Sequence, residues 1–490
     1  MAAFDDRVRA DARNYRWYVL ATVFVGTFMA PLDSSIVNIA IPSLGREFSV
    51  GITTIEWVVT AYLLTTSVLL LSAGRLGDML GHKRIYISGF AIFTTASALC
   101  GLSGGIGQLI FFRVLQAIGA TCMLAAGPAI LTDTFPASER GKALGMVAVS
   151  VALGLTVGPF LGGFIVGHLG WRWIFFVNVP VGILASVLAA RVLKEGRREA
   201  GKRFDFSGSA LALMALFSVL LALSMGNEWG WRSLRTGGLL IAAAAAGVLF
   251  IAVEKKIQDP VLDLSLFKNR LFSAANASAL INYASLFVVM FLMPFYLGYV
   301  FRASTQVTGM ALTAVPLATA LVAPISGALS DKIGSRLLST AGLAVTSLAL
   351  FGLSRTAPAG GLVSVAALLG AVGLGSGMFQ SPNTSAIMGS VPRNRLGVAS
   401  ALQATMRNVG MVLGVALSGA IVATFAPKGE FDPNYAAAIH FAFATGAAIA
   451  AMGAVLSLTR GPAGEPLKRR PAEAALEMAR QNLEDNPQTE

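Results

Sequence analysis

The sequence is poor in charge and in cysteine. Only 13% of its 490 residues are charged, 55% are hydrophobic, and the mean hydropathy is +0.70. A soluble globular domain carries about 25% charged residues, so this composition excludes an ordinary soluble protein. The two cysteines, Cys100 and Cys122, lie inside apolar runs. We therefore expect packed side chains rather than a disulfide or a metal site.

Sequence signatures of hydrolytic chemistry are also lacking. The chain contains no GxxxxGK[ST] phosphate loop, no zinc-ligand spacing, and no GxSxG turn in a strand–helix context. We expect no enzyme activity, no metal and no cofactor. Active transport by such a chain would draw on an ion gradient, and the proton gradient is the expected source.

Long apolar runs are what the sequence has in abundance. About fourteen of them reach the length of roughly 20 residues that a membrane-spanning helix needs. They predict an all-α polytopic membrane protein in contact with the lipid bilayer. The runs lie at residues 17–41, 53–73, 84–103, 107–133, 142–166, 171–191, 207–225, 237–253, 271–298, 308–328, 337–354, 361–388, 397–424 and 437–459.

Charge is distributed unevenly between the loops. The chain has 37 basic and 25 acidic residues, a net charge of +12, and its basic residues cluster in every second loop. This alternation argues against nucleic acid as a partner. By the positive-inside rule it predicts a multi-pass protein of the cell inner membrane with both termini in the cytoplasm, and hence an even number of spans.

Two sets of residues repeat along the chain. Gly74–Arg84 reads GRLGDMLGHKR, and Gly327–Arg336 reads GALSDKIGSR, 253 residues further on. A glycine-lined segment around Gly154 repeats around Gly410, 256 residues further on. Repeats of this kind predict two bundles related by pseudo-symmetry, as in secondary transporters.

The runs therefore group as six, two and six helices. We divide the chain into an N-terminal six-helix bundle at 1–195, a linker with two additional helices at 196–256, a C-terminal six-helix bundle at 257–460 and a polar tail at 461–490. The expected fold is two pseudo-symmetric six-helix bundles plus two extra central helices, with 14 spans in all.

The segment Gly74–Arg84 combines glycines, one acid and basic side chains. A polar turn of about ten residues there must lie at a membrane face, because hydrocarbon offers its charges no partners. Asp78 would accept from the N–H groups of a helix start or pair with a neighbouring cation. The alternative is an ordinary basic loop. The residues with the expected gating role are Gly74, Arg75, Gly77, Asp78, Gly81, Lys83 and Arg84.

Asp33 is the only acid well inside the first apolar run. A carboxyl there is costly unless it is paired, protonated or in water, so we expect Asp33 to load and release a proton. The alternative is a structural acid hydrogen-bonded to Asn38 or to a neighbouring helix. Arg113, in the fourth run, is the expected partner, because an arginine keeps its charge and can hold a carboxylate. The alternative for Arg113 is a side chain that extends to the lipid headgroups.

The fifth run carries a row of glycines. Gly154, Gly158 and Gly162 stand four residues apart on one helix face, which favours close helix contact, and Pro159 removes a backbone hydrogen bond. We expect this segment, which also includes Gly163, to control closure of the bundle. The corresponding helix of the second half lacks the proline, so we expect the two halves to differ in function.

Polar side chains inside the apolar runs are candidates for a substrate cavity. Arg407 lies about ten residues into its run, roughly 15 Å deep, and either faces a wet cavity or meets Asp33 across the bundle interface. Amides are the other candidates, although such residues also serve as interhelical contacts. They are Asn38, Gln380, Asn383 and Gln403.

The motifs together resemble one known family. GRLGDMLGHKR is similar to the cytoplasmic loop signature of the major facilitator superfamily, and RVLQAIGAT around Arg113 is similar to its fourth-span motif. GLTVGPFLGG, from Gly154 to Gly163, resembles the fifth-span antiporter motif. LDSSIVNIAIP, which contains Asp33, resembles the first-span motif of the fourteen-span drug:proton antiporter branch (the EmrB/QacA type). The resemblance covers about residues 15 to 460.

This resemblance implies a proton-coupled exporter of amphipathic small molecules or drugs, acting as a monomer by alternating access. Some multidrug members carry an acid where this chain has Thr60, while Glu56 lies near the outer surface. We therefore expect monovalent, neutral or anionic lipophilic substrates. The alternatives are a dedicated exporter or importer of one metabolite on the same fold, and a non-transporting membrane sensor or scaffold.

Overall fold

The protein is mainly helical. The computed structural model describes residues 2–136, 139–195, 206–230, 232–255, 264–356, 361–391, 396–427 and 432–460. These ranges contain sixteen α-helices, a 3-10 turn η1, a π-helical turn η2 and no strand. The elements are α1 (Ala2–Glu47), α2 (Ile52–Ile55), α3 (Trp57–Leu80), α4 (His82–Gly101), α5 (Ile106–Thr134), α6 (Arg140–His168), α7 (Trp173–Phe176), α8 (Asn178–Val192), α9 (Phe206–Trp229), α10 (Leu234–Glu254), η1 (Leu264–Lys268), α11 (Arg270–Phe295), η2 (Tyr296–Val300), α12 (Thr305–Ile333), α13 (Ser335–Ser354), α14 (Gly361–Gly389), α15 (Leu396–Phe425) and α16 (Tyr435–Leu458).

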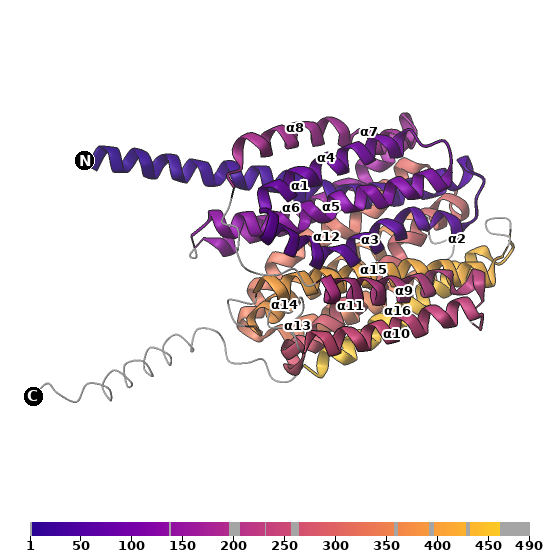
Figure 1. Cartoon of the computed structure of the whole chain (residues 1–490). Coiled ribbons are helices and arrows are strands. Elements are labelled where there is room, and N and C mark those ends of the chain that lie inside the picture. Colours follow the sequence, from indigo (N-terminus) through magenta and orange to yellow (C-terminus); the bar gives the residue numbers. More distant parts are fainter. Residues whose placement is uncertain are drawn as a thin grey trace, which may run out of the picture.

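The long helices lie roughly side by side across the molecule (Figure 1). Among the described residues, twelve helices are long and apolar enough to cross a membrane. The chain is therefore a multi-pass membrane protein, but the prediction of fourteen spans is not supported. The two helices that fall short are α4 and α9.

Composition explains why α4 differs from the other long helices. α4 begins with His82, Lys83 and Arg84 and contains several Ser and Thr residues, which lower its hydropathy. α9 is as apolar as its neighbours; its described apolar stretch ends at Ala222 because the side chains of the next two residues lie outside the described residues. Both segments are nevertheless helical where the sequence predicted helices.

The helices pack in two sets whose pairings repeat. In the first set α1 packs on α6, α4 on α5 and α8, and α3 on α5. In the second set α11 packs on α15, α13 on α14 and α16, and α12 on α14. Each helix of the first set thus has a counterpart in the second, as the repeated glycines predicted.

Contacts between the two sets are also reciprocal. α6 packs against α12, and α3, the counterpart of α12, packs against α15, the counterpart of α6. One apolar core extends through both sets, from Val19 in α1 to Ala450 in α16. α9 and α10 pack on each other, and α9 also contacts α3 and α15. The extra pair therefore lies against the seam between the two sets.

The repeated loop motif is a much shorter connection than predicted. α3 continues to Leu80 and α4 begins at His82, so Gly81 alone joins them, with φ of 99°. Likewise Gly334, with φ of 87°, alone joins α12 and α13. The expected ten-residue polar turn is wrong, because glycine tolerates this left-handed conformation and lets the chain reverse within one residue.

The two ends of the molecule can be told apart by their connections. We name the end that carries Gly81, Gly334 and the last residues of α8 and α16 the basic end, because Lys83 and Arg84 lie there. The other end carries residues 48–56, 169–177 and 301–304. We name it the opposite end.

Candidate functional site

A buried ion pair joins two helices of the first set. Asp33 lies in α1 and Arg113 lies about two turns into α5. Their side chains are 0% and 1% exposed. Arg113 Nη1 donates to Asp33 Oδ2. The structure therefore brings together the acid and the arginine that the sequence singled out.

Two amides complete the coordination of the carboxylate. Gln116 Nε2 donates to Asp33 Oδ1 at 2.8 Å, and Asn178 Nδ2, at the start of α8, donates to the same oxygen at 2.9 Å. Ser97 in α4 accepts from Gln116 at 3.1 Å and from Asn178 at 3.2 Å. Asp33 is thus held directly by α5 and α8 and indirectly by α4, and both of its oxygens are hydrogen-bonded.

Arg113 has partners besides the acid. Its Nε donates to the carbonyl oxygen of Val58 at 3.0 Å, and its Nη1 donates to Gln116 Oε1 at 2.7 Å. The guanidinium carbon lies 4.2 Å from the centroid of the Tyr62 ring. Hydrogen bonds and a cation–π contact together offset part of the cost of burying the charge.

A proton on the Asp33 carboxylate would alter this network. Protonation of Asp33 would remove the negative charge that holds Arg113 and would turn one acceptor oxygen into a donor. Arg113 would keep its charge and its hydrogen bonds to Val58 and Gln116. A single proton would therefore change the contact between α1 and α5 while leaving α3 attached to α5.

The structure decides several of the alternatives that the sequence left open. Arg113 does not extend to headgroups, because it is enclosed at 1% exposure. Arg407 does not meet Asp33, because Arg113 occupies that position; its Nε lies 3.5 Å from Asn408 Oδ1 instead. Nor does Asn38 bind the carboxylate: the amides that donate to Asp33 belong to Gln116 and Asn178.

Gln116, Asn178, Ser97 and Tyr62 were missed by the sequence interpretation. Gln116 follows Arg113 by three residues, one turn of helix, so both side chains point the same way. That spacing could have identified Gln116. Asn178 and Ser97 lie in other helices and carried no signal, because amides and hydroxyls in apolar helices are common.

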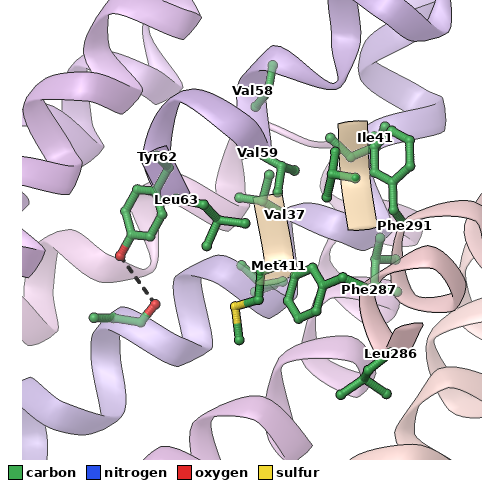
Figure 2. Packing of buried hydrophobic residues seen from close by; sticks show 14 of the residues in the cluster. Val37, Ile41, Val58, Val59, Tyr62, Leu63, Leu286, Phe287, Phe291 and Met411 are labelled. Carbon is green, nitrogen blue, oxygen red and sulfur yellow. Dashed lines mark hydrogen bonds between the residues drawn. The ribbon is translucent and has the colours of Figure 1, made fainter. Parts of the chain in front are cut away.

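An apolar cluster separates this site from the second set of helices. Figure 2 shows side chains of α1 and α3, including Val37 and Val59, packed against Phe287 and Phe291 of α11. Tyr62 borders the cluster, and its hydroxyl donates to the carbonyl oxygen of Ala30 at 3.4 Å (Figure 2). The Tyr62 ring therefore contacts both this apolar cluster and the Arg113 guanidinium.

The glycine row of α6 packs against α1. A Cβ on Gly154 would lie 2.6 Å from the Phe28 carbonyl oxygen, and one on Gly158 would overlap Ser35 Oγ. Gly162 lies against Ile36 in the same way. In the second set Gly410 and Gly414 lie against Leu280 and Ala284 of α11. The predicted close helix contact is thus present in both sets.

The next glycine of each row faces the other set, near the opposite end. Gly163 lies against Gly309 of α12, with a Cβ on Gly163 only 3.1 Å from the Gly309 Cα. At the counterpart crossing, Gly419 of α15 lies against Glu56, which is 2% exposed. Glu56, one residue before Trp57, lies at the opposite end and is buried there, because α15 covers it.

The loop motif contributes contacts within the first set. Lys83 Nζ donates to the Ala190 carbonyl oxygen of α8 at 3.0 Å, and Arg84 pairs with Glu195 at 2.8 Å. Gly77 packs on His82. The side chains of Arg75 and Asp78 lie outside the described residues, and the expected role of Asp78 stays a prediction.

The structure gives the cavity candidates of the second set local partners. Gln380 donates to Ser376 at 3.2 Å and Gln403 to Thr384 at 2.6 Å. Asn383 donates to the Ala275 carbonyl oxygen at 3.2 Å. These are interhelical or intrahelical hydrogen bonds, and none of them joins two of the candidates. A shared ligand site for them stays a prediction.

Relatives of known type match most of the chain. It is 39% identical over 402 residues to the riboflavin transporter RibZ of Clostridioides difficile, covering 82% of this chain and 87% of that protein. It is 34% identical over 403 residues to the multidrug resistance protein Stp of Mycobacterium tuberculosis, covering 82% and 75%. The tetracenomycin C resistance and export protein of Streptomyces glaucescens is 33% identical over 415 residues, with 84% and 77% covered.

A solved structure shares the fold. The crystal structure of a bacterial homolog of the human lysosomal transporter Spinster superposes with a TM-score of 0.68 at 16% identity, covering 91% of this chain and 97% of that one. Residues 23–255 and 276–485 match the family profile described as Major Facilitator Superfamily. Since family members are transporters, a non-enzymatic role fits. With its repeated helix pairing and its matching relatives, the chain belongs to the Major Facilitator Superfamily.

Proposed function

We propose that the chain is a proton-coupled exporter, an antiporter that moves amphipathic small molecules or drugs outward by alternating access. The buried Asp33–Arg113 pair carries this proposal, because ionisable groups inside a membrane bundle mark proton or ion pathways. Relatives whose names include multidrug resistance and tetracenomycin export support the substrate class.

The proposed cycle uses the two charge states of the site. With Asp33 ionised, its carboxylate holds Arg113, and α1, α4, α5 and α8 are joined through one network. Protonation from one face of the membrane loosens that network, and release of the proton to the other face restores it. The two sets of helices rock against each other between these states, about a substrate site near the midplane.

Export against proton entry also requires an orientation. The basic end is proposed to face the cytoplasm, together with both termini, in the cell inner membrane. The domain division at 1–195, 196–256, 257–460 and 461–490 is kept as part of the proposal, as are a monomeric state and the absence of a cofactor. Residues 196–205 and 461–490 lie outside the described residues.

Membership of the fourteen-span drug:proton antiporter branch is likewise proposed. α4 and α9 support it, because these helices of 20 and 24 residues pack beside the twelve candidate spans. Labelling of engineered cysteines from each side of the membrane would test the count. Fourteen spans require residue 230 and residue 103 to be reached from the same side as residue 50.

Reconstituted vesicles with an imposed proton gradient test the coupling. We expect dye efflux in the natural protein and none with Asp33→Asn, because the variant cannot exchange a proton. Glu47→Gln is the matched control: Glu47 is also in α1 and pairs with Arg172, at 3.3 Å, but its side chain is 48% exposed. Equal rates in Asp33→Asn and natural protein, at equal insertion, would contradict the proposal.

A second candidate function is the transport of a single metabolite. The 39% identity to a riboflavin transporter favours it, since that identity exceeds the 34% and 33% of the multidrug and tetracenomycin relatives described above. Competition in the same vesicles separates the two. Riboflavin that competes with every dye at low concentration would favour the metabolite transporter, whereas a broad panel of competing lipophilic compounds would favour the drug exporter.

A further inference from the structure

A small apolar layer lies inside the second set of helices. Ala279 of α11, Leu343 of α13 and Phe379 of α14 form a buried cluster, and Ala454 of α16 packs against it. The four residues show where the inward faces of four helices meet. This layer fixes which neighbouring residues also point into the bundle, because positions three or four apart share a helix face.

A polar layer follows one turn nearer the basic end. Each of the four helices has a buried polar side chain there, exposed by 2% or less, with an atom that has no hydrogen-bond partner among the described residues. An interhelical hydrogen bond from Asn383 to the Ala275 carbonyl oxygen, at 3.2 Å, joins α14 and α11 at this level. The unpartnered atoms are Asn276 Oδ1, Ser339 Oγ, Asn383 Oδ1 and Ser457 Oγ.

Arg460 closes this layer at its basic end. It follows α16 directly, its exposure is 2%, and its guanidinium carbon lies 5.7 Å from the centroid of the Phe379 ring. None of its three side-chain nitrogens has a hydrogen-bond partner among the described residues. Burial lowers the pKa of Arg460 to about 10, so the group is still charged at neutral pH.

Among the described side chains, the surrounding helices supply no counter-charge; Asp331 of α12, which packs on α13 and α14, has its side chain outside the described residues. The sequences of α11, α13, α14, α15 and α16 contain no Asp and no Glu. An isolated buried charge is strongly unfavourable unless an opposite charge accompanies it. The five guanidinium N–H groups of Arg460 and the two serine hydroxyls of the layer are available as hydrogen-bond donors, while its two amide oxygens can accept from water.

We propose that this polar layer binds one small monovalent anion, held by Arg460, Ser339 and Ser457, with chloride as the simplest occupant. A free ion fits better than a lipid phosphate, because Arg460 is enclosed between helices while its neighbours Leu458 and Thr459 are exposed. The anion neutralises the second set of helices. This site is separate from the Asp33 network and independent of the proposed export.

Thermal unfolding of the purified full chain in neutral detergent tests the site. Chloride is titrated against gluconate at constant ionic strength, and the midpoint temperature Tm is measured. We expect Tm to rise saturably with chloride in the natural protein and to stay flat with Arg460→Met. The matched control is Arg355→Gln: Arg355 also lies over a phenylalanine, Phe351, at 5.2 Å, but is exposed. It should keep the chloride response.

A second variant covers the case in which Arg460→Met does not fold. Ser339→Ala combined with Ser457→Ala removes two donors and leaves the charge, and should raise the half-saturating chloride concentration roughly tenfold. Bromide, in place of chloride, should give anomalous density beside Arg460 in crystals of the natural protein.

Four results would overturn the site. The first is a Tm of the natural protein that does not depend on the anion, and the second is a chloride response that survives in Arg460→Met. The third is an unchanged half-saturating concentration in the serine double variant. The fourth is stabilisation by phosphatidylglycerol but not by chloride, bromide or inorganic phosphate, which would make a lipid phosphate the occupant.

Discussion

The two halves of the molecule share their helix pairing and differ in their buried polar groups. In the first half, the Asp33 carboxylate and the Arg113 guanidinium satisfy each other, and Gln116 and Asn178 complete the network. In the second half, Arg460 is buried without a protein partner among the described residues. The fold therefore does not dictate the electrostatics: one half contains its own counter-charge, and the other needs one from outside.

Removing one charge in each half gives the largest expected contrast. Asp33→Ala leaves Arg113 buried without its anion, which should lower the free energy of unfolding by about 3–5 kcal/mol. Arg460→Met removes a charge that has no protein partner, and should raise stability in chloride-free buffer. Thermal unfolding in detergent measures both. Equal destabilisation by the two variants would show that both halves depend on internal pairing.

The glycine rows give the next largest difference. A Cβ on Gly414 would overlap the Ala284 carbonyl oxygen, which is backbone, whereas one on Gly158 would overlap the Ser35 hydroxyl. Gly414→Ala should therefore cost about 1–3 kcal/mol, and Gly158→Ala less. Adding Ser35→Ala should recover part of the loss at Gly158. The comparison fails if Gly158→Ala is the more damaging, as judged from thermal unfolding.

The repeated loop acids should differ in their effect on conformation. Asp78 has three basic residues in its motif, and Asp331 has Ala328 where Asp78 has Arg75. A charge-assisted hydrogen bond is worth about 1.5–3 kcal/mol, so Asp78→Asn should shift the population toward opening at the basic end by about tenfold or more. Asp331→Asn should shift it less. Double electron–electron resonance distances between spin labels on α3 and α15 would measure the two population shifts. A larger shift with Asp331→Asn than with Asp78→Asn would contradict the prediction.

The smallest expected difference concerns the crossings near the opposite end. A Cβ on Gly309 would overlap the Pro159 carbonyl oxygen, while one on Gly419 would meet the flexible side chain of Glu56. Gly309→Ala should widen the label distance between α6 and α12, and Gly419→Ala should change the distance between α3 and α15 only slightly. If Gly419→Ala gives the larger opening, Glu56 is held rigidly.

Sequence-based prediction was most successful for charged residues whose burial requires an oppositely charged partner. Asp33 and Arg113 lie inside apolar runs, and each charge requires the other, so their contact was predictable. The burial of Arg460 was not predictable, because nothing in sequence separates a charge that ends a helix from one that folds back into the bundle. The same limit applied to Glu56, whose burial depends on α15, more than 350 residues away.

Helix ends were less predictable than helix existence. The polar residues of Gly74–Leu80 predicted a reverse turn, yet they form the last two helical turns of α3. Backbone hydrogen bonding within the helix continues regardless of side-chain polarity. Only the φ of Gly81 reverses the chain. The count of spans differs for a related reason at α4, which is helical without being uniformly apolar.

A connection of one residue also limits how the two helices that it joins can move relative to each other. Gly81 and Gly334 leave no slack between the helices that they join. Neither α3 against α4 nor α12 against α13 can slide lengthwise by a helical turn, about 5.4 Å, without tearing hydrogen bonds from a helix end. We therefore expect each helix pair to move as one rigid unit about its connection at the basic end. The two helices of a pair can still tilt, and a tilt of one helix moves the other with it.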